Sequence, residues 1–272
     1  MRAARPLPSR PANRAAAALW LALTSAVAGA SEVVLYDDTT GLPGDGPLLT
    51  LCTNTLCLGS DPDVTEVRTA MGTRLTTTAA ARAGYTNLLA ADFPPLVRSQ
   101  GIRLTFEVKV ASETHSSDDR AGFSVIALAE DARGIELGFW EDRVWAQSDA
   151  DFRRAETALI DTQATERRYV LELLGDRYRL SVDDALVLDG PVRDYSAAGL
   201  PYVIGSFVFF GDNTTRAAAE IEIGRLGLAT GIAADTRTVP LPAPALPLIA
   251  AAALAPALRL SRRGRACAAT RR

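Results

Sequence analysis

Residues 135–147 read Ile135-Glu136-Leu137-Gly138-Phe139-Trp140-Glu141-Asp142-Arg143-Val144-Trp145-Ala146-Gln147, and this stretch carries the clearest fold signal in the chain. If Glu141-Asp142 is a two-residue turn, Trp140 pairs with Arg143 and the pairing runs back to the ends of the stretch. One face of this hairpin is then wholly apolar, so we expect it to lie against a core. The turn lacks the glycine that such turns favour, which leaves a slipped register as the alternative.

Short alternating runs continue on both sides of this hairpin, and Gly, Asp and Asn separate them. No long segment with helical periodicity appears outside the two ends of the chain. The further predicted strands are residues 102–110, the hairpin 169–182 with its turn at Gly175-Asp176, residues 207–210 and residues 219–228. The sequence therefore predicts an all-β domain over residues 31–229, an antiparallel β-sandwich of jelly-roll or concanavalin-like type.

Charge is distributed unevenly along the 272 residues. The first 30 and the last 36 residues hold eleven arginines and no acid. Removing these arginines from the 29 basic residues leaves 18 against 32 acidic residues, so the middle of the chain carries a net charge of −14. Phosphate backbones repel such a domain, and we expect no nucleic acid among its partners.

The N-terminus has the pattern of a secretory signal. Four arginines precede an apolar run from Ala15 to about Leu23, and Ala28-Gly29-Ala30 supplies the small residues that signal peptidase accepts. We therefore expect a signal helix within residues 1–30 and a mature N-terminus at Ser31. The alternative is an N-terminal anchor helix, which the short apolar run disfavours.

The C-terminal residues 239–272 combine a motif, an apolar run and a basic tail. The motif is Val239-Pro240-Leu241-Pro242-Ala243, the apolar run continues to Leu258, and a cluster of arginines begins at Arg259. A run of about 20 apolar residues can just span a bilayer as a helix, with its basic end in the cytoplasm and the acidic domain outside. The prolines within the run weaken such a helix, which suits a transient span.

This tripartite tail resembles the PEP-CTERM sorting signals of Gram-negative bacteria, in the variant whose motif reads VPLPA. The resemblance implies cleavage by an exosortase-type peptidase and transfer from the inner membrane to the outer surface or extracellular matrix. Two features depart from the pattern, because Pro256 interrupts the apolar run and the chain continues past the arginine cluster. A plain C-terminal membrane anchor is the alternative. Residues 230–238 are predicted to be a polar spacer between the sandwich and this tail.

Three cysteines are present, and two of them lie close together. Cys52 and Cys57 are separated by four residues, and in an exported protein such a pair predicts a local disulfide. A metal site would need further ligands, and the one histidine, His115, is distant in the sequence. Cys267 falls in the cytoplasmic tail and is expected to have no partner.

The second face of the 135–147 hairpin is unusual, because it carries two indoles, a carboxylate, a guanidinium and an amide. Such a set on one sheet face is able to bind a sugar. The alternative is that the tryptophans form a second buried layer or lie under a loop. The candidate glycan-binding residues are Glu136, Trp140, Arg143, Trp145 and Gln147.

A second resemblance concerns the domain itself. Residues 112–126, 134–147, 193–195 and 209–215 resemble the choice-of-anchor Y family. The resemblance covers most of residues 32–228 and implies architecture and location, since these domains occur with varied C-terminal anchors. It implies no enzymatic activity.

The sequence offers little support for a catalytic arrangement of side chains. A glycosidase needs two converging carboxylates; Glu136 and Asp142 could share a face of the hairpin, but Asp142 lies at the turn. A Ser-His-Asp set would require His115, and no G-x-S-x-G elbow surrounds a serine. We therefore expect no enzyme, with His115 as a hydrogen-bonding loop residue. A secreted glycan hydrolase that uses Glu136 is the alternative function.

No cofactor is predicted, although calcium is a minor hypothesis. Asp118, Asp119, Asp212 and Asn213 supply oxygen ligands on expected loops. Turn-forming Asx residues explain both clusters equally well, and no EF-hand-type loop is present.

Together these features predict an exported surface or matrix protein with a non-catalytic β-sandwich. Its expected partners are signal peptidase, an exosortase-type peptidase, the membrane through the C-terminal tail, and an extracellular polysaccharide bound weakly. A purely structural role without a ligand is the third alternative.

Overall fold

In the computed structural model of the protein, the described residues are 32–39, 41–54, 57–149 and 151–232. The signal segment 1–30 and the sorting tail 239–272, with the helices expected in them, lie outside this part of the chain. Within the described ranges, no helix has the length and apolar character needed to cross a membrane. The helical turns described there are the short 3₁₀ segments η1 (Pro43–Asp45) and η2 (Ser196–Ala198).

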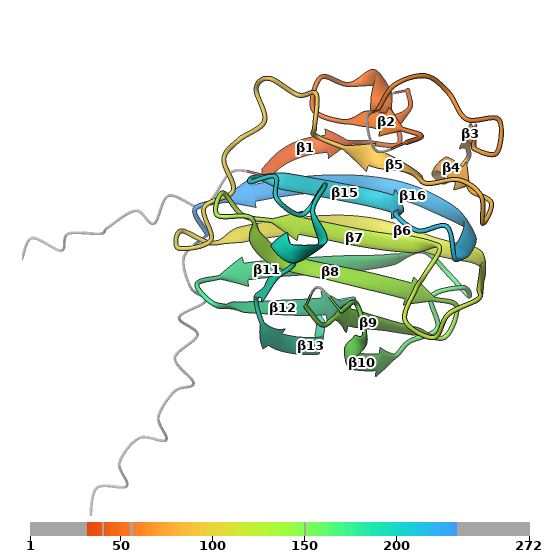
Figure 1. Cartoon of the computed structure of the whole chain (residues 1–272). Helices are drawn as coiled ribbons and strands as arrows, with labels where there is room; N and C mark the ends of the chain where they lie inside the picture. Colours follow the sequence, from red (N-terminus) through yellow and green to blue (C-terminus); the bar gives the residue numbers. More distant parts are fainter. Residues whose placement is uncertain (1–31, 40, 55–56, 150, 233–272) are drawn as a thin grey trace, which may run out of the picture. The chain divides into compact units, whose positions relative to one another are not determined.

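Two antiparallel sheets pack face to face and confirm the predicted all-β sandwich (Figure 1). Sheet A has the order β13 (Ala185–Pro191), β12 (Arg177–Val182), β11 (Arg167–Leu174), β6 (Ile102–His115), β16 (Ala217–Thr230), β4 (Gly72–Thr76) and β3 (Thr65–Thr69), with β1 (Glu32–Tyr36) also paired with β16. Sheet B has the order β10 (Arg154–Leu159), β9 (Arg143–Gln147), β8 (Arg133–Trp140), β7 (Phe123–Leu128), β15 (Phe207–Asp212), β5 (Ala83–Thr86) and β2 (Thr50–Cys52), with β14 (Arg193–Asp194) also paired with β8.

The hairpin that the sequence predicts most sharply forms in the predicted register. Strands β8 and β9 pair Trp140 with Arg143 and Gly138 with Trp145, so Glu141-Asp142 is the turn and no slip occurs. The hairpin of β11 and β12 likewise pairs Leu174 with Arg177 around the predicted turn. Both predicted pairings are therefore confirmed. They were predictable because the position of the turn and the alternation of side chains together determine the register of a hairpin.

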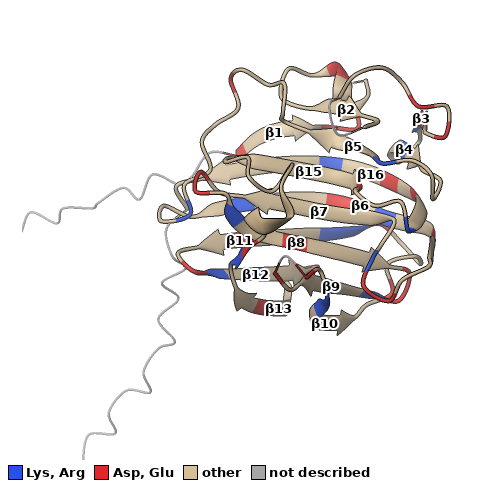
Figure 2. Cartoon of the chain, viewed as in Figure 1, with Lys and Arg blue, Asp and Glu red and all other residues tan. Residues whose placement is uncertain are grey.

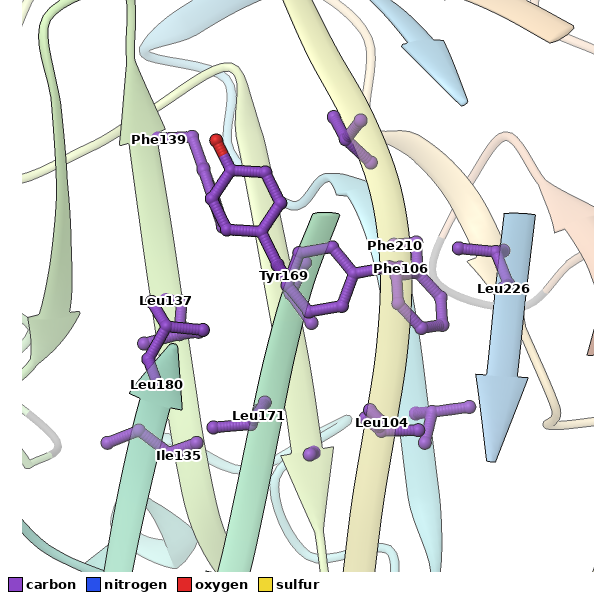
Figure 3. Close-up of a cluster of buried hydrophobic side chains, with 14 of the residues drawn as sticks. Leu104, Phe106, Ile135, Leu137, Phe139, Tyr169, Leu171, Leu180, Phe210 and Leu226 are labelled. Atoms are coloured by element: carbon purple, nitrogen blue, oxygen red, sulfur yellow. The ribbon is translucent and has the colours of Figure 1, made fainter. Parts of the chain in front are cut away.

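The core lies between the two sheets and is rich in aromatic side chains (Figure 3). Phe106 of β6 stacks on Tyr169 of β11 with ring centroids 5.1 Å apart. Phe139 and Phe210 of sheet B meet this pair edge-on, at 5.3 Å from Tyr169 and 6.0 Å from Phe106 respectively. Each such contact adds about 0.5–1.5 kcal/mol to the burial of the rings, so this cluster joins the two sheets.

Charged side chains of sheet A pair across neighbouring strands, and Figure 2 marks the positions of the charged residues along the chain. Arg103 of β6 donates to Glu172 of β11, at 2.6 and 2.8 Å. Arg74 of β4 pairs with Glu220 and Glu222 of β16. Glu222 is buried, whereas Arg103 and Arg74 remain partly exposed, and partly exposed pairs of this kind contribute little to stability.

The β domain extends slightly beyond its predicted end. Strand β16 runs to Thr230, the Gly231 N–H donates to the Gly101 carbonyl at 2.9 Å, and Ile232 is buried. Residues 230–232, which were predicted to begin the polar spacer, therefore pack with the β domain, and residues 233–238 lie outside the described part of the chain.

Candidate functional site

The outer face of sheet B carries the candidate site, and strand register defines its central row. Thr50 pairs with Thr86, Thr86 with Phe209, Phe209 with Ile126, and Ile126 with Glu136. Strands in a sheet are about 4.8 Å apart, so the row crosses five neighbouring strands. Its side chains share one face, opposite the core.

At the β8–β9 end of this face, the predicted sugar-binding residues are covered. Trp145, Glu136 and Gln147 are each at most 1% exposed, and Trp140 is 7% exposed. Arg143 lies at the edge and forms a two-bond ion pair with Asp142 of the turn. The predicted open face is therefore wrong, and the alternative of a second buried layer is the one that the structure has.

Two covering segments explain this burial. The indole N–H of Trp140 donates to the Arg120 carbonyl at 2.8 Å, and the Gln147 amide donates to the Asp119 carbonyl at 2.9 Å. From the other side, the Arg154 guanidinium lies 4.7 Å from the centre of the Trp140 ring. The segment at Asp119 and Arg120 and the side chain of Arg154 thus occupy the position that a ligand would need.

His115 also contributes to this cover. It is the last residue of β6 rather than a loop residue, and its ring stacks on Trp140 with centroids 3.8 Å apart. The predicted hydrogen-bonding role is confirmed, since Nδ1 lies 2.8 Å from a Glu113 carboxylate oxygen. His115 remains exposed at its outer side, and within the described residues no serine is hydrogen-bonded to it.

Glu136 is held in a hydrogen-bonded cage beneath the loop that follows β14. Tyr202 donates to one carboxylate oxygen at 2.6 Å, and the Asn213 amide donates to the other at 2.9 Å. The Arg120 guanidinium is 4.0 Å away. Burial raises the pKa of the Glu136 carboxyl, while the bonds from Tyr202 and Asn213 and the charge of Arg120 oppose this shift.

Beside this cage, the same sheet face opens into a pocket of about 80 Å³. Its base is formed by Phe209, Thr86 and Ile126 from the central row. The pocket is bordered on one side by the disulfide loop and on the other by the loop that contains Tyr202. Further lining residues are Cys52, Asn54, Cys57, Arg82, Leu88, Leu200, Pro201, Phe207, Asp212 and Asn213.

The ring of Phe209 lies directly over Gly84 of β5. A Cβ atom at Gly84 would come within 2.5 Å of the ring, so the missing side chain makes room for it. Phe209 remains partly exposed in the pocket, whereas Phe207 on the same strand face is buried. The pocket therefore presents an aromatic surface at its base.

Two polar groups of the pocket have unused bonding capacity. The Thr86 side chain is 3% exposed, and its hydroxyl has no hydrogen-bond partner among the described residues. The amide of Asn213 donates to Glu136 and to the Tyr202 hydroxyl, so both of its hydrogens are engaged. Its carbonyl oxygen is left as an acceptor, and the buried Glu136 determines how this amide is oriented.

Asp212 lines the same pocket but is fully buried. Its carboxylate accepts a hydrogen bond from the Thr214 N–H and another from the Thr77 hydroxyl, both at 2.9 Å. Burial raises the pKa of Asp212 to about 8, which exceeds the lowering effect of these bonds and of the more distant Arg82. Near neutral pH this acid is therefore mostly uncharged.

The predicted disulfide is confirmed, and it forms part of the pocket wall. Cys52 and Cys57 are bonded, and Thr53 donates to the Gly59 carbonyl at 3.2 Å within the same loop. Cys52 belongs to β2, so the covalent bond fastens the loop to the edge of sheet B.

The calcium candidates fall into different environments. Asp118 is exposed, whereas Asp119 accepts a hydrogen bond from the Arg154 N–H at 2.9 Å. Asp212 and Asn213 are engaged in the bonds given above. The described residues contain no group of three or more His, Cys, Asp or Glu side chains placed to hold a metal ion.

The sequence prediction missed Phe209, Thr86 and Arg82. A signal was present, because residues 207–210 are apolar on both strand faces, which indicates that the outer face is covered or contacts a ligand. Thr86 could not be found in this way, since its role depends on its cross-strand neighbours.

No protein-family model matches the chain, and no curated protein sequence matches it. Several solved structures are similar in fold. The lumenal domain of VIP36, in a Ca²⁺/Man3GlcNAc-bound form, has a TM-score of 0.43 and 10% identity over 75% of this chain and 90% of that chain. Alginate lyase A1-II' has a TM-score of 0.42 and 8% identity over 73% of this chain and 94% of that chain. The Crh5 transglycosylase in complex with NAG has a TM-score of 0.48 and 13% identity over 74% of this chain and 86% of that chain.

Proposed function

We propose that this chain is an exported bacterial envelope protein whose β-sandwich binds a carbohydrate without transforming it, in the pocket over β5, β15 and β7. The observation that carries the proposal is the partly exposed Phe209 ring at the base of the pocket, next to the polar side chain of Asn213. The C–H face of a sugar packs on an aromatic ring, and its hydroxyls bond to nearby polar groups. The Asn213 carbonyl oxygen would supply a further acceptor.

Carbohydrate binding is tested with the full-length chain in non-ionic detergent, by glycan-array screening followed by calorimetry on the glycans retained. Phe209→Leu keeps an apolar side chain but removes the aromatic face, and we expect about a tenfold loss of affinity. Thr86→Val removes the hydroxyl at nearly constant shape. We expect this variant to raise the free energy of unfolding by about 1 kcal/mol, because an unpaired buried hydroxyl is destabilising, and to keep its glycan affinity, because the hydroxyl is buried beneath the pocket surface.

A matched control is Trp145→Phe, which alters the buried layer of the same sheet face outside the pocket lining. It should retain binding once its fold is verified by circular dichroism. Retention of no glycan by the wild-type chain would refute the carbohydrate proposal and favour a purely structural role.

The second candidate is a glycan hydrolase that uses Glu136, and the raised pKa of this carboxyl favours it, since a general acid must hold its proton near neutral pH. Against it, both carboxylate oxygens are hydrogen-bonded and the side chain is 1% exposed. Assays for reducing ends decide between the two. Release that disappears in Glu136→Gln, with the fold intact, would establish the enzyme, whereas unaltered recovery of the glycan supports a binding protein.

The envelope location rests on the two ends of the sequence, with the resemblance of the tail to PEP-CTERM signals and of the domain to the choice-of-anchor Y family. The intact mass of the chain from the cell envelope tests it. We expect a polypeptide that begins near Ser31 and ends between Val239 and Ala243. A chain that retains Arg272 would refute sorting and indicate a plain membrane anchor.

A further inference from the structure

We propose that the sugar bound in this pocket carries a carboxylate on its terminal ring, and that Arg82 binds this carboxylate. The inference rests on the proposed carbohydrate-binding function and goes further by naming the class of ligand. It follows from the charges around the pocket, from the pairing of the arginines, and from the size of the cavity.

Arg82 differs from many arginines of the domain because no acid of the described residues pairs with it. On sheet A, Arg103 and Arg177 each pair with an acidic residue of a neighbouring strand. Arg82 is exposed, borders the pocket and forms no ion pair with any residue in the described ranges. A guanidinium presents a planar fork of donors that matches a carboxylate in two parallel bonds, so Arg82 offers this recognition at the pocket mouth.

The local charge at the pocket is opposite in sign to that of the domain. Among the residues that line the pocket, the charged side chains are Arg82 and Asp212. Asp212 directs its oxygens to Thr77 and Thr214, and its burial disfavours the charged form. A negatively charged group at the mouth therefore meets the guanidinium without a competing local anion.

The size of the pocket and the overall charge limit the ligand to one acidic ring. A pocket of about 80 Å³ holds part of one ring, so the remaining rings of a longer glycan would lie outside it. The net charge of −14 over the middle of the chain repels a polyanion. Screening over about 8 Å at physiological salt weakens that repulsion for a single carboxylate at Arg82. A terminal uronic acid on an otherwise neutral glycan fits the size of the pocket and carries a single negative charge.

The test uses matched disaccharide pairs that differ only at C6 of the terminal ring: glucuronic against glucose, galacturonic against galactose, and mannuronic against mannose. Each is titrated calorimetrically into the full-length chain in non-ionic detergent. We expect the acidic member of at least one pair to bind about tenfold more tightly than its neutral partner, as a charge-assisted bond predicts. Arg82→Ala should remove this preference, so that the acidic and the neutral member of the pair bind with about equal affinity.

Two further variants sharpen the result. Arg82→Lys keeps the charge but loses the fork, so it should retain part of the preference. Arg179→Ala removes an exposed arginine from β12 of the other sheet and should have no effect. Equal or tighter binding of the neutral sugars by the wild-type chain would refute the role of Arg82 and leave the proposed function standing. Binding of no member of any pair would refute this inference, while glycan retention on the array decides the proposed function separately.

Discussion

Replacing Asp212 by Asn should make the domain much less sensitive to pH. The pKa of Asp212 is about 8 in the fold, against 3.8 for an ordinary carboxyl, so the folded state keeps a proton that the unfolded chain releases. For an acid shifted upward, stability is unaffected below the unfolded pKa and falls as the pH rises towards the folded pKa. Integrated from pH 5 to pH 9, this one group removes about 4 kcal/mol from the free energy of unfolding. The amide introduced by Asp212→Asn would keep an acceptor for the Thr214 N–H, while its NH2 group would donate to the Thr77 oxygen, which reverses the bond that Thr77 donates to the carboxylate.

The assay is denaturant unfolding at pH 5, 7 and 9, followed by the fluorescence of the buried Trp140 and Trp145. Burial also raises the pKa values of Glu136 and Glu113, so some loss of stability at high pH should persist in the variant. The informative quantity is therefore the difference between Asp212→Asn and the wild-type chain. An equal fall in both proteins from pH 5 to pH 9 would refute the assignment of a buried, protonated Asp212.

Two other perturbations test the packing around the site. A Cβ atom at Gly138 would lie 2.5 Å from Cζ2 of Trp145, so Gly138→Ala should lower the free energy of unfolding by about 1–3 kcal/mol. Gly46→Ala is the control, because a Cβ atom there has its nearest neighbour at 4.0 Å, and it should leave the free energy of unfolding nearly unchanged. Equal melting temperatures of the two variants would contradict the close packing of Trp145. Replacing Cys52 and Cys57 together by Ser should lower the free energy of unfolding by about 2 kcal/mol, because a short loop is no longer closed in the unfolded chain. It should also weaken glycan binding, because both residues line the pocket. Unchanged affinity would show that the loop is not part of the binding site.

The hairpins illustrate why part of the fold was predictable. Pairing of Trp140 with Arg143 follows from a turn at Glu141-Asp142 and from alternation over a few residues, and both are local properties. The strands β6, β15 and β16 were recognised for the same reason, and each is longer than its predicted segment. The edge strand β10 was not predicted, because its alternation is weak and it has a partner on one side only.

The candidate site shows where such reasoning fails. Glu136, Trp140 and Trp145 do lie on the face of sheet B that points away from the core, as predicted. Their side chains are nevertheless buried. Segments that precede β7 and follow β9 fold back over these residues, and nothing within the hairpin encodes that contact. Glu136 consequently orients the Asn213 amide instead of facing solvent.

The sequence by itself determined the all-β class, the local hairpin registers and the pairing of Cys52 with Cys57, because each depends on residues that are close along the chain. It also predicts the export signal and the sorting tail, which lie outside the described residues. Only the tertiary structure decided which part of sheet B is covered and which part is open. The pocket brings Arg82 and Thr86, which flank and end β5, together with Phe209 from the distant strand β15, and this arises only when β5 and β15 are hydrogen-bonded side by side.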